Sequence, residues 1–307
     1  MNYGPLIFLA AFFALATSWF GFVLTPQIQV GRLPQTNTVP DAVIYPVARP
    51  GLAKEGIDVY RANGCASCHS QQLGQTATVA DVILTDAGTN QTATIAALLQ
   101  VNPRLSQAEA KQLIGNLPKT VLQGVKKSTA DAALRLLKVG DAKAELWVVP
   151  TGPDIARGWG KRRSVAEDFL FDYPVMPGAL RIGPDLAGIG LRLADPAWHL
   201  IHLYEPRSLV KDSTMPPFRF LFEKRRIERG LSPDALPLTG SLAPPPGFEI
   251  IPTAEARSLV AYLISLRGDV PLFNAPLTVP VAAPAATNAP GVSPGSTNAA
   301  PTNAPAK

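Results

Sequence analysis

The sequence predicts a mainly α-helical protein that is anchored in a membrane and whose folded domain is interrupted by a small α+β insert. Three observations lead to this fold class. An uncharged run from Pro5 to Leu24 is long enough to cross a bilayer. Residues 77–152 alternate strand-like with helix-like pieces, and the segments on either side carry helical patterns. The chain therefore divides into an anchor (1–26), a Pro-punctuated linker (27–50), a discontinuous helical domain (51–76 and 153–270), the insert (77–152) and a tail (271–307).

The first element is the anchor. About 20 apolar residues rising 1.5 Å each span the roughly 30 Å hydrocarbon layer, and Trp19, Phe20 and Phe22 gather near one end, as at a membrane interface. A cleaved signal peptide is the alternative, because Ala14-Leu15-Ala16 resembles a cleavage site. No Lys or Arg precedes the apolar run, however, and the run continues past that site. We expect an uncleaved, single-pass helix.

Composition limits the classes of partner. The net charge of +5 suits an acidic partner or an anionic membrane surface. The basic residues are scattered and no nucleic-acid motif accompanies them, so we expect no nucleic-acid partner. We interpret the runs 161–163 (Lys-Arg-Arg) and 224–226 (Lys-Arg-Arg) as solvated faces, with docking to an acidic protein or lipid headgroups as the alternative. The tail has almost no large apolar residue to offset its ordering entropy, and we expect it to be disordered.

The insert has a recognisable pattern. Strand-like VADVILTD is followed by two short helical segments, a strand or turn, a third helix and a closing strand. The stretch LPKTVLQGVKKSTADAALRLLKVGDAKAELWV, residues 117–148, resembles the C-terminal domain of the bacterial ribosomal stalk protein. The resemblance implies a small, independently folding α+β unit and no ribosomal role.

The chemistry begins at Cys65-Ala66-Ser67-Cys68-His69. Two thiols three residues apart on one turn can form thioethers with the two vinyl groups of one haem, and the adjacent His then points at the iron. A redox dithiol would not need the His. A zinc site would need two further ligands, and only His199 and His202 are left to supply them. We therefore predict one covalently bound haem c, held by Cys65, Cys68 and His69, in a class I cytochrome c domain.

The sixth iron ligand has several candidates. Met215 lies in a Ser-Thr-Met-Pro-Pro loop, where the prolines stiffen the backbone and suit a neutral thioether ligand. Met176, also followed by proline, is the nearest competitor. His199 and His202 are further alternatives, although such a pair one turn apart is more often hydrogen-bonded structure. An open sixth position would make the protein a haem sensor.

Outside the insert, residues 60–221 resemble the monohaem subunit (subunit II) of cbb3-type cytochrome c oxidases. The resemblance depends on GCASCHSQ (64–71), RGWGKRRSVAEDFLFDYPVMPGALRIGPDL (157–186) and WHLIHLYEPRSLVKDSTMPPF (198–218). It implies that Met215 is the distal ligand and that the Pro184 carbonyl accepts the Nδ1 proton of His69. The chain departs from the family by its insert and by Phe218, which stands where the family has tyrosine.

Arginines are the natural partners of buried haem propionates, because a buried carboxylate needs a charged donor. We predict this role for Arg181, Arg192 and Arg207; an exposed surface arginine is the alternative for each. In a class I cytochrome c domain, the helix around Tyr60 packs against the final helix around Tyr262. The insert must also leave and rejoin the domain at nearby points, since the segments on both sides serve one pocket.

The predicted function is an electron relay. The resemblance implies a bacterial inner-membrane protein with its haem domain on the periplasmic side, which passes electrons to the catalytic haem–copper subunit together with further cytochrome c subunits. The chain alone would catalyse no reaction. The monohaem subunit of a nitric oxide reductase shares the anchor-plus-haem plan and is one alternative; a haem-based sensor is the other.

Overall fold

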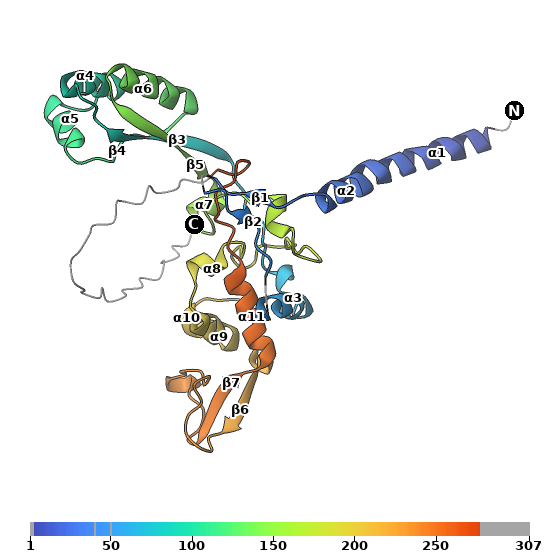
Figure 1. Cartoon of the computed structure of the whole chain (residues 1–307). Helices are drawn as coiled ribbons and strands as arrows, with labels where there is room; N and C mark the ends of the chain where they lie inside the picture. The colour runs from blue at the N-terminus through green and yellow to red at the C-terminus, as the bar shows by residue number, and fades with distance from the viewer. Residues whose placement is uncertain (1–2, 40, 50, 277–307) are drawn as a thin grey trace.

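The computed structural model describes residues 3–39, 41–49 and 51–276 (Figure 1). One apolar helix extends from the N-terminus, helical elements and small sheets make up the rest, and the insert lies at the opposite end of the molecule from the last hairpin. The helices are α1 (Gly4–Trp19), α2 (Thr25–Gly31), α3 (Leu52–Ala62), α4 (Gln91–Val101), α5 (Gln107–Ile114), α6 (Lys127–Val139), α7 (Pro153–Ala156), α8 (Ile189–Arg192), α9 (Pro196–Tyr204), α10 (Pro206–Leu209) and α11 (Ala254–Ser265). The strands are β1 (Thr36–Asn37), β2 (Ile44–Tyr45), β3 (Ala77–Asp86), β4 (Lys119–Val125), β5 (Lys143–Thr151), β6 (Phe222–Arg226) and β7 (Phe248–Pro252).

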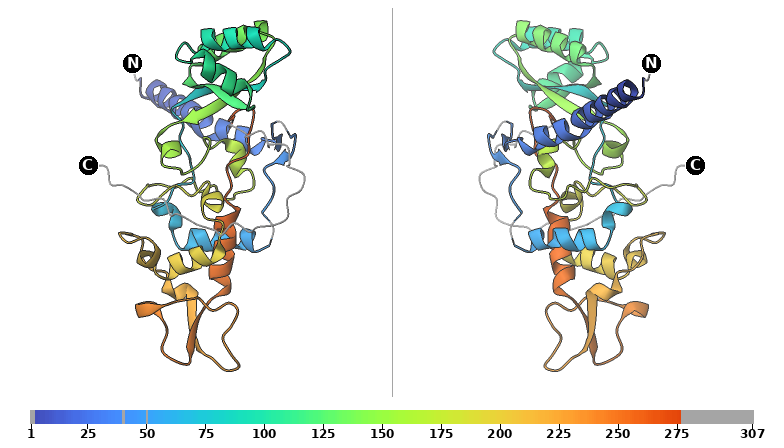
Figure 2. Two further views of the ribbon diagram at one scale, coloured as in Figure 1. Left: turned by 90° about the vertical axis from the view of Figure 1, so that its left-hand side faces the viewer. Right: turned by 90° about the vertical axis from the view of Figure 1, so that its right-hand side faces the viewer.

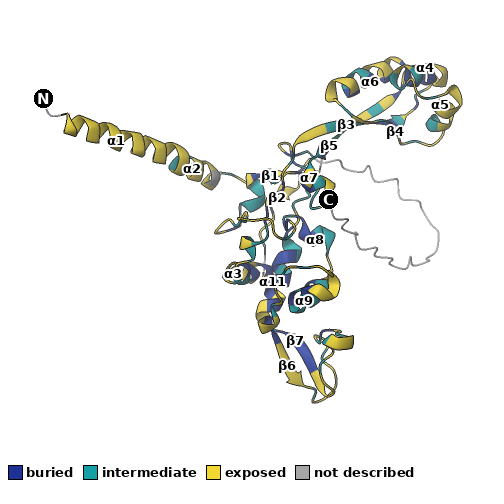
Figure 3. Cartoon of the chain, turned by 180° about the vertical axis from the view of Figure 1, so that it is seen from behind, coloured by how far each residue is buried: buried dark blue, intermediate teal, exposed yellow. Residues whose placement is uncertain are grey.

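The N-terminal helix is longer than the sequence predicts. A π-helical turn over Phe20–Leu24 joins α1 to α2, so the helix continues past Pro26 to Gly31. Proline lacks the N–H that would continue an α-helical ladder; the wider turn before it and the Thr25 hydroxyl, which donates to the Phe20 carbonyl at 2.9 Å, accommodate this loss. The predicted linker is therefore helical at its start. The helical segment 4–29 is long and apolar enough to cross a membrane, and none of its residues is buried (Figure 3).

The insert is a three-stranded antiparallel sheet in the order β4-β3-β5, with α4 and α6 packed on it. Its strands and helices fall where the sequence predicts them. Helix α5 starts with a capping box, in which the Ser106 and Glu109 side chains satisfy each other's backbone N–H groups. The insert has its own core, in which Val82, Leu84 and Leu98 are fully buried.

The helical part is organised around the crossing of α3 and α11, as predicted. Tyr60 and Tyr262 pack edge to face with ring centroids 5.3 Å apart. Helix α11 starts at the predicted N-cap, where the Thr253 hydroxyl accepts the Ala256 N–H at 3.2 Å. Figure 2 shows α11 running along the centre of this part, with the β6-β7 hairpin beyond its N-terminal end. This crossing holds the residues that lead into the cysteine motif.

The run 161–163 corrects one prediction. We expected a solvated face, yet the Arg162 side chain is 0% exposed. Its guanidinium makes two bonds to the Asp168 carboxylate, at 2.7 and 3.0 Å, and its Nε donates to the Val270 carbonyl. A run of charged residues predicts exposure only when the fold brings no carboxylate into contact with it. Here Asp168 accepts two hydrogen bonds from the planar guanidinium of Arg162, so this side chain can be buried as an ion pair.

The start of the predicted tail is also packed. Leu272 and Ala275 are buried against Val165, and the Pro271 carbonyl accepts the Val39 N–H at 3.0 Å. These few residues close a small cluster between the linker and the helical part. The prediction of disorder for residues 277–307 lies outside the described residues.

Candidate functional site

The cysteine motif forms a tight turn directly after α3. Gly64 adopts φ +64°, which ends the helical run without a steric cost. Residues 65–67 form a 3₁₀ turn, and the His69 N–H donates to the Cys65 carbonyl at 3.0 Å. Burial raises the pKa of the Cys65 thiol to about 11. Cys65 and Cys68 are not joined to each other, so both thiols are free to react with one ligand.

The His69 imidazole is held from one side by the loop before α8. Its Nδ1 lies 2.8 Å from the Pro184 carbonyl oxygen. Because a carbonyl can only accept, Nδ1 carries the proton and Nε2 keeps its lone pair for a metal. Gly183 packs closely against the ring, since a Cβ there would stand 2.2 Å from His69 Cε1. This is the contact that the resemblance implies for Pro184.

The loop before α8 follows the cysteine motif along its whole length. Four backbone hydrogen bonds of 2.7–3.0 Å join the two segments: Gln71 N–H to Pro177 O, Ala179 N–H to Ala66 O, Gly183 N–H to Cys68 O, and Leu186 N–H to Ser70 O. The loop and the motif therefore form one wall of the site. Met176 directly precedes Pro177 in this loop and packs against the same core cluster as Cys65.

Met215 comes from a different element. It follows α10, is partly buried, and packs against the core cluster that Cys65 also contacts. The Ser213 hydroxyl accepts the Met215 N–H at 3.3 Å, and Arg207 Nε donates to the Ser213 carbonyl at 3.2 Å. Arg207, predicted as a propionate partner, is thus engaged in supporting the methionine loop.

Arg192 Nε and His202 Nδ1 are among the buried polar atoms that have no hydrogen-bond partner within the described residues. Such atoms are rare and call for a missing ligand or water. Burial lowers the pKa of both groups, that of His202 to about 4. His199, by contrast, uses its Nε2 in a 2.7 Å contact with the Leu193 carbonyl, which makes it a structural residue.

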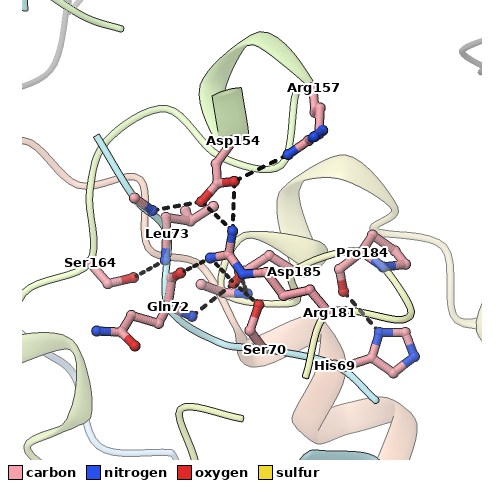
Figure 4. A network of polar contacts seen from close by, with 12 residues as sticks. His69, Ser70, Gln72, Leu73, Asp154, Arg157, Ser164, Arg181, Pro184 and Asp185 are labelled. Carbon is pink, nitrogen blue, oxygen red and sulfur yellow. Dashed lines mark hydrogen bonds and ion pairs between the residues drawn. The ribbon is translucent and has the colours of Figure 1, made fainter. Parts of the chain in front are cut away.

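Arg181 has partners that the sequence analysis missed (Figure 4). Its guanidinium donates to both Asp154 oxygens, at 2.7 and 2.8 Å, and to the Gln72 carbonyl. The buried Asp185 carboxylate lies 3.7 Å away and accepts from Ser70 Oγ at 2.6 Å. Asp185 lies in the quoted stretch 157–186, but its contact with Ser70 is not visible in the sequence, and Asp154 carries no motif signal.

The fit of these residues to a covalent haem can be judged from the geometry. Two unpaired thiols and an imidazole whose Nδ1 bonds the Pro184 carbonyl meet on one turn, and Met215 packs against the same core from another element. An unpartnered buried guanidinium nitrogen suits a carboxylate of the ligand. Within the described residues, the chemistry of this donor set fits a haem.

Comparison with known proteins separates the chain into two parts. Residues 147–234 match the family model of the cytochrome C oxidase, mono-heme subunit/FixO. This similarity supports, at the level of the family, a monohaem subunit of a cbb3-type oxidase, with electron transport as its setting. The match contains Arg181, Pro184, Arg192 and Met215, and the cysteine motif lies before it.

The insert has a different relationship. Residues 80–146 match the ribosomal protein L7/L12 C-terminal domain. The large ribosomal subunit protein bL12 of Acidovorax sp. (strain JS42) is 42% identical over 66 residues, which are 22% of this chain and 52% of that protein. The bL12 protein of Delftia acidovorans (strain DSM 14801 / SPH-1) gives the same identity and coverage, and that of Corynebacterium aurimucosum (strain ATCC 700975 / DSM 44827 / CIP 107346 / CN-1) is 39% identical over 66 residues with the same coverage. The chain thus spans about half the length of these relatives.

Proposed function

We propose that the protein is a membrane-anchored, monohaem c-type cytochrome that relays electrons to the catalytic subunit of a cbb3-type haem–copper oxygen reductase. The observation that carries the proposal is the contact of His69 with Gly183 and Pro184. It joins the haem-attachment motif, which precedes the family match, to the segment that matches the oxidase subunit. Two parts of the chain separated by the insert thus build one site.

Each residue has a defined role in this proposal. Cys65 and Cys68 would hold the haem as thioethers, and His69 would bind the iron through Nε2. The Pro184 carbonyl fixes the imidazole tautomer and raises its basicity. Arg192 supplies the unpartnered donor for a propionate. When bound, the haem would supply one-electron transfer, which none of these side chains can perform.

Met215 is the proposed sixth ligand rather than Met176. The loop that begins at Met176 is hydrogen-bonded to the motif and belongs to the His69 wall. The Met215 loop follows α10, is supported by Ser213 and Arg207, and makes none of these backbone bonds to the motif among the described residues. We therefore assign the sixth position to Met215. A saturated iron exchanges electrons and binds no substrate.

The setting follows from the N-terminal helix. Its exposed apolar surface fits a single-pass anchor in a bacterial inner membrane. We propose that the haem domain lies on the periplasmic side, with the catalytic subunit and further cytochrome c subunits as its partners. Oxygen reduction would occur in the catalytic subunit.

The experiment that tests this function is expression with the c-type cytochrome maturation system, followed by intact mass measurement. We expect the added mass of one tetrapyrrole, lost in Cys65→Ser/Cys68→Ser. Met215→Ala should keep the covalent haem but lose the weak near-infrared thioether-to-iron band. Met176→Ala is the matched control and should keep that band.

Two results would contradict the proposal. A mature chain without added tetrapyrrole mass would show that the protein is not a c-type cytochrome. Ready binding of carbon monoxide to the wild-type protein would contradict a saturated iron and favour a haem sensor. Purification of the intact complex with metal analysis then tests the partner: copper supports the oxidase, whereas a non-haem-iron partner supports a nitric oxide reductase.

A further inference from the structure

The two ends of the insert meet in a short stem beside the site. Ala77 on β3 pairs with Thr151 on β5, and the Thr76 N–H donates to the Thr151 carbonyl at 2.9 Å. Just below, the Gly74 N–H donates to Asp154 Oδ2 at 2.7 Å. Asp154, which follows the insert, is therefore hydrogen-bonded to Gly74, which precedes it. Its carboxylate is 5% exposed.

The same carboxylate reaches the wall that holds His69. Arg181 Nη1 donates to both Asp154 oxygens, and its Nη2 donates to the Gln72 carbonyl (Figure 4). The other end of this short loop is Asp185, 0% exposed, which accepts the Gln72 N–H at 2.8 Å. Both ends of the loop are thus held by charge-assisted hydrogen bonds, the strongest class available to side chains.

Between these two fastened ends lie the residues that contact the imidazole. Gly183 packs against the His69 ring, and the Pro184 carbonyl is 2.8 Å from its Nδ1. Arg181 lies only three residues before Pro184 in the same short loop. Second-sphere carbonyls of this kind orient a metal-bound histidine and raise its basicity, and the hydrogen bonding around the axial ligands is one of the protein's means of setting a haem potential.

We infer that Asp154 and Arg181 are positioning residues for the His69 imidazole, and that through Asp154 the stem of the insert fixes the haem reduction potential. The inference rests on the proposed function, since it requires a haem on His69. It gives Arg181 a role different from the propionate contact that the sequence suggested. It also links the insert to electron transfer, because the two ends of the insert are joined by Asp154, which in turn holds Arg181.

The test is a potentiometric titration of the full-length, haem-loaded protein in detergent. Asp154→Asn and Arg181→Gln should each weaken the imidazole's hydrogen bond and make it a poorer donor to ferric iron. We expect the ratio of reduced to oxidised protein at a fixed potential to rise about threefold, which is a midpoint shift of about +28 mV for one electron. Arg181→Lys keeps the charge without the two-pronged geometry and should give a smaller shift.

Arg157 provides a matched control. It contacts the same carboxylate at 3.7 Å and, like Arg181, lies over the Trp159 ring, but its side chain is more exposed, and within the described residues it has no hydrogen bond or ion pair to the segment 69–72. Arg157→Gln should leave the midpoint unchanged. The double variant Asp154→Asn/Arg181→Gln should shift no further than either single change, because both remove one interaction.

The outcomes separate this inference from the proposed function. If the wild-type chain holds haem and the Asp154 and Arg181 variants have the same midpoint potential as wild type, the positioning role is wrong but the proposed function as a cytochrome is unaffected. An equal shift in Arg157→Gln also overturns it, as a general charge effect. If Asp154→Asn fails to accumulate, the two Arg181 variants decide the question. If the wild type carries no haem, the proposed function itself fails.

Discussion

Replacing Gly56 by alanine tests whether the α3–α11 crossing positions the cysteine motif. A Cβ at this position would lie 2.0 Å from the Ser258 carbonyl oxygen, whereas ordinary contacts begin at 3.4 Å. The obstacle is backbone on the opposite helix, so no side-chain rotation relieves it. The helices must separate by the difference, about 1.4 Å. The Tyr60–Tyr262 pair lies on the same interface and would loosen with it.

The change in unfolding free energy is the sum of two destabilising contributions and one stabilising contribution. Overpacking a close contact costs about 1–3 kcal/mol, and loosening the aromatic pair costs about 0.5–1.5 kcal/mol. Alanine in place of glycine within a helix returns about 1 kcal/mol of helix propensity. We expect a net loss of about 2 kcal/mol, which lowers Tm by about 4–8 °C for a domain of this size.

Thermal unfolding of the full-length protein in detergent, followed by circular dichroism, measures the effect. Gly115→Ala in the insert is the control, because its Cβ would meet nothing closer than 3.5 Å, and its Tm should stay the same or rise slightly. A Tm for Gly56→Ala equal to or above that of wild type would refute the close approach of the two helices.

Three further changes probe other parts of the molecule. Arg162→Met removes the charged partner of the largely buried Asp168 carboxylate, which keeps the Tyr45 hydroxyl and the Val165 N–H as donors, and should destabilise the protein by about 3 kcal/mol. Arg163→Met, at an exposed position, should cost far less in the same denaturant titration. The Thr89 hydroxyl and N–H donate to Asp141 and hold its pKa below the usual 3.8. The stability that this group contributes is therefore present above pH 3.8 and is lost as the pH falls through the lower, folded-state pKa. Asp141→Asn should make the unfolding midpoint less dependent on pH in this acid range, and an unchanged dependence would contradict the contact. Deleting residues 1–31 and expressing the chain alone should move it from the membrane pellet to the soluble fraction after ultracentrifugation, and a chain that still pellets with membranes would show that another surface binds them.

Much of the fold is encoded in local patterns and could be predicted. The 3.6-residue periodicity of α11 and its Thr253 cap, and the short run of apolar residues in β3, depend on neighbouring residues only. The extension of the N-terminal helix through Pro26 was missed because a proline predicts a helix end unless a π turn precedes it. The packed residues Leu272 and Ala275 were missed for a related reason: an Ala- and Pro-rich composition hides short apolar contacts.

In the candidate site, too, the residues that are close in sequence could be predicted, and the contacts between distant segments could not. Cys65, Cys68 and His69 lie within five residues, so their spacing alone indicates a haem. The partners of Arg181 could not be predicted, because Asp154 reaches it only after the insert has folded back on itself. Arg162 shows the same limit, since a charge run looks solvated until the fold brings a carboxylate to it.

The stem of the insert has a practical consequence. Because Thr76 and Thr151 are hydrogen-bonded neighbours, the polypeptide between them begins and ends at almost one point in space. A domain attached in this way can be exchanged for another whose own ends lie close together, without altering the spacing of the segments on either side. A fluorescent reporter or an affinity module could therefore be grafted at this position while Asp154 and Gly74 keep their hydrogen bond.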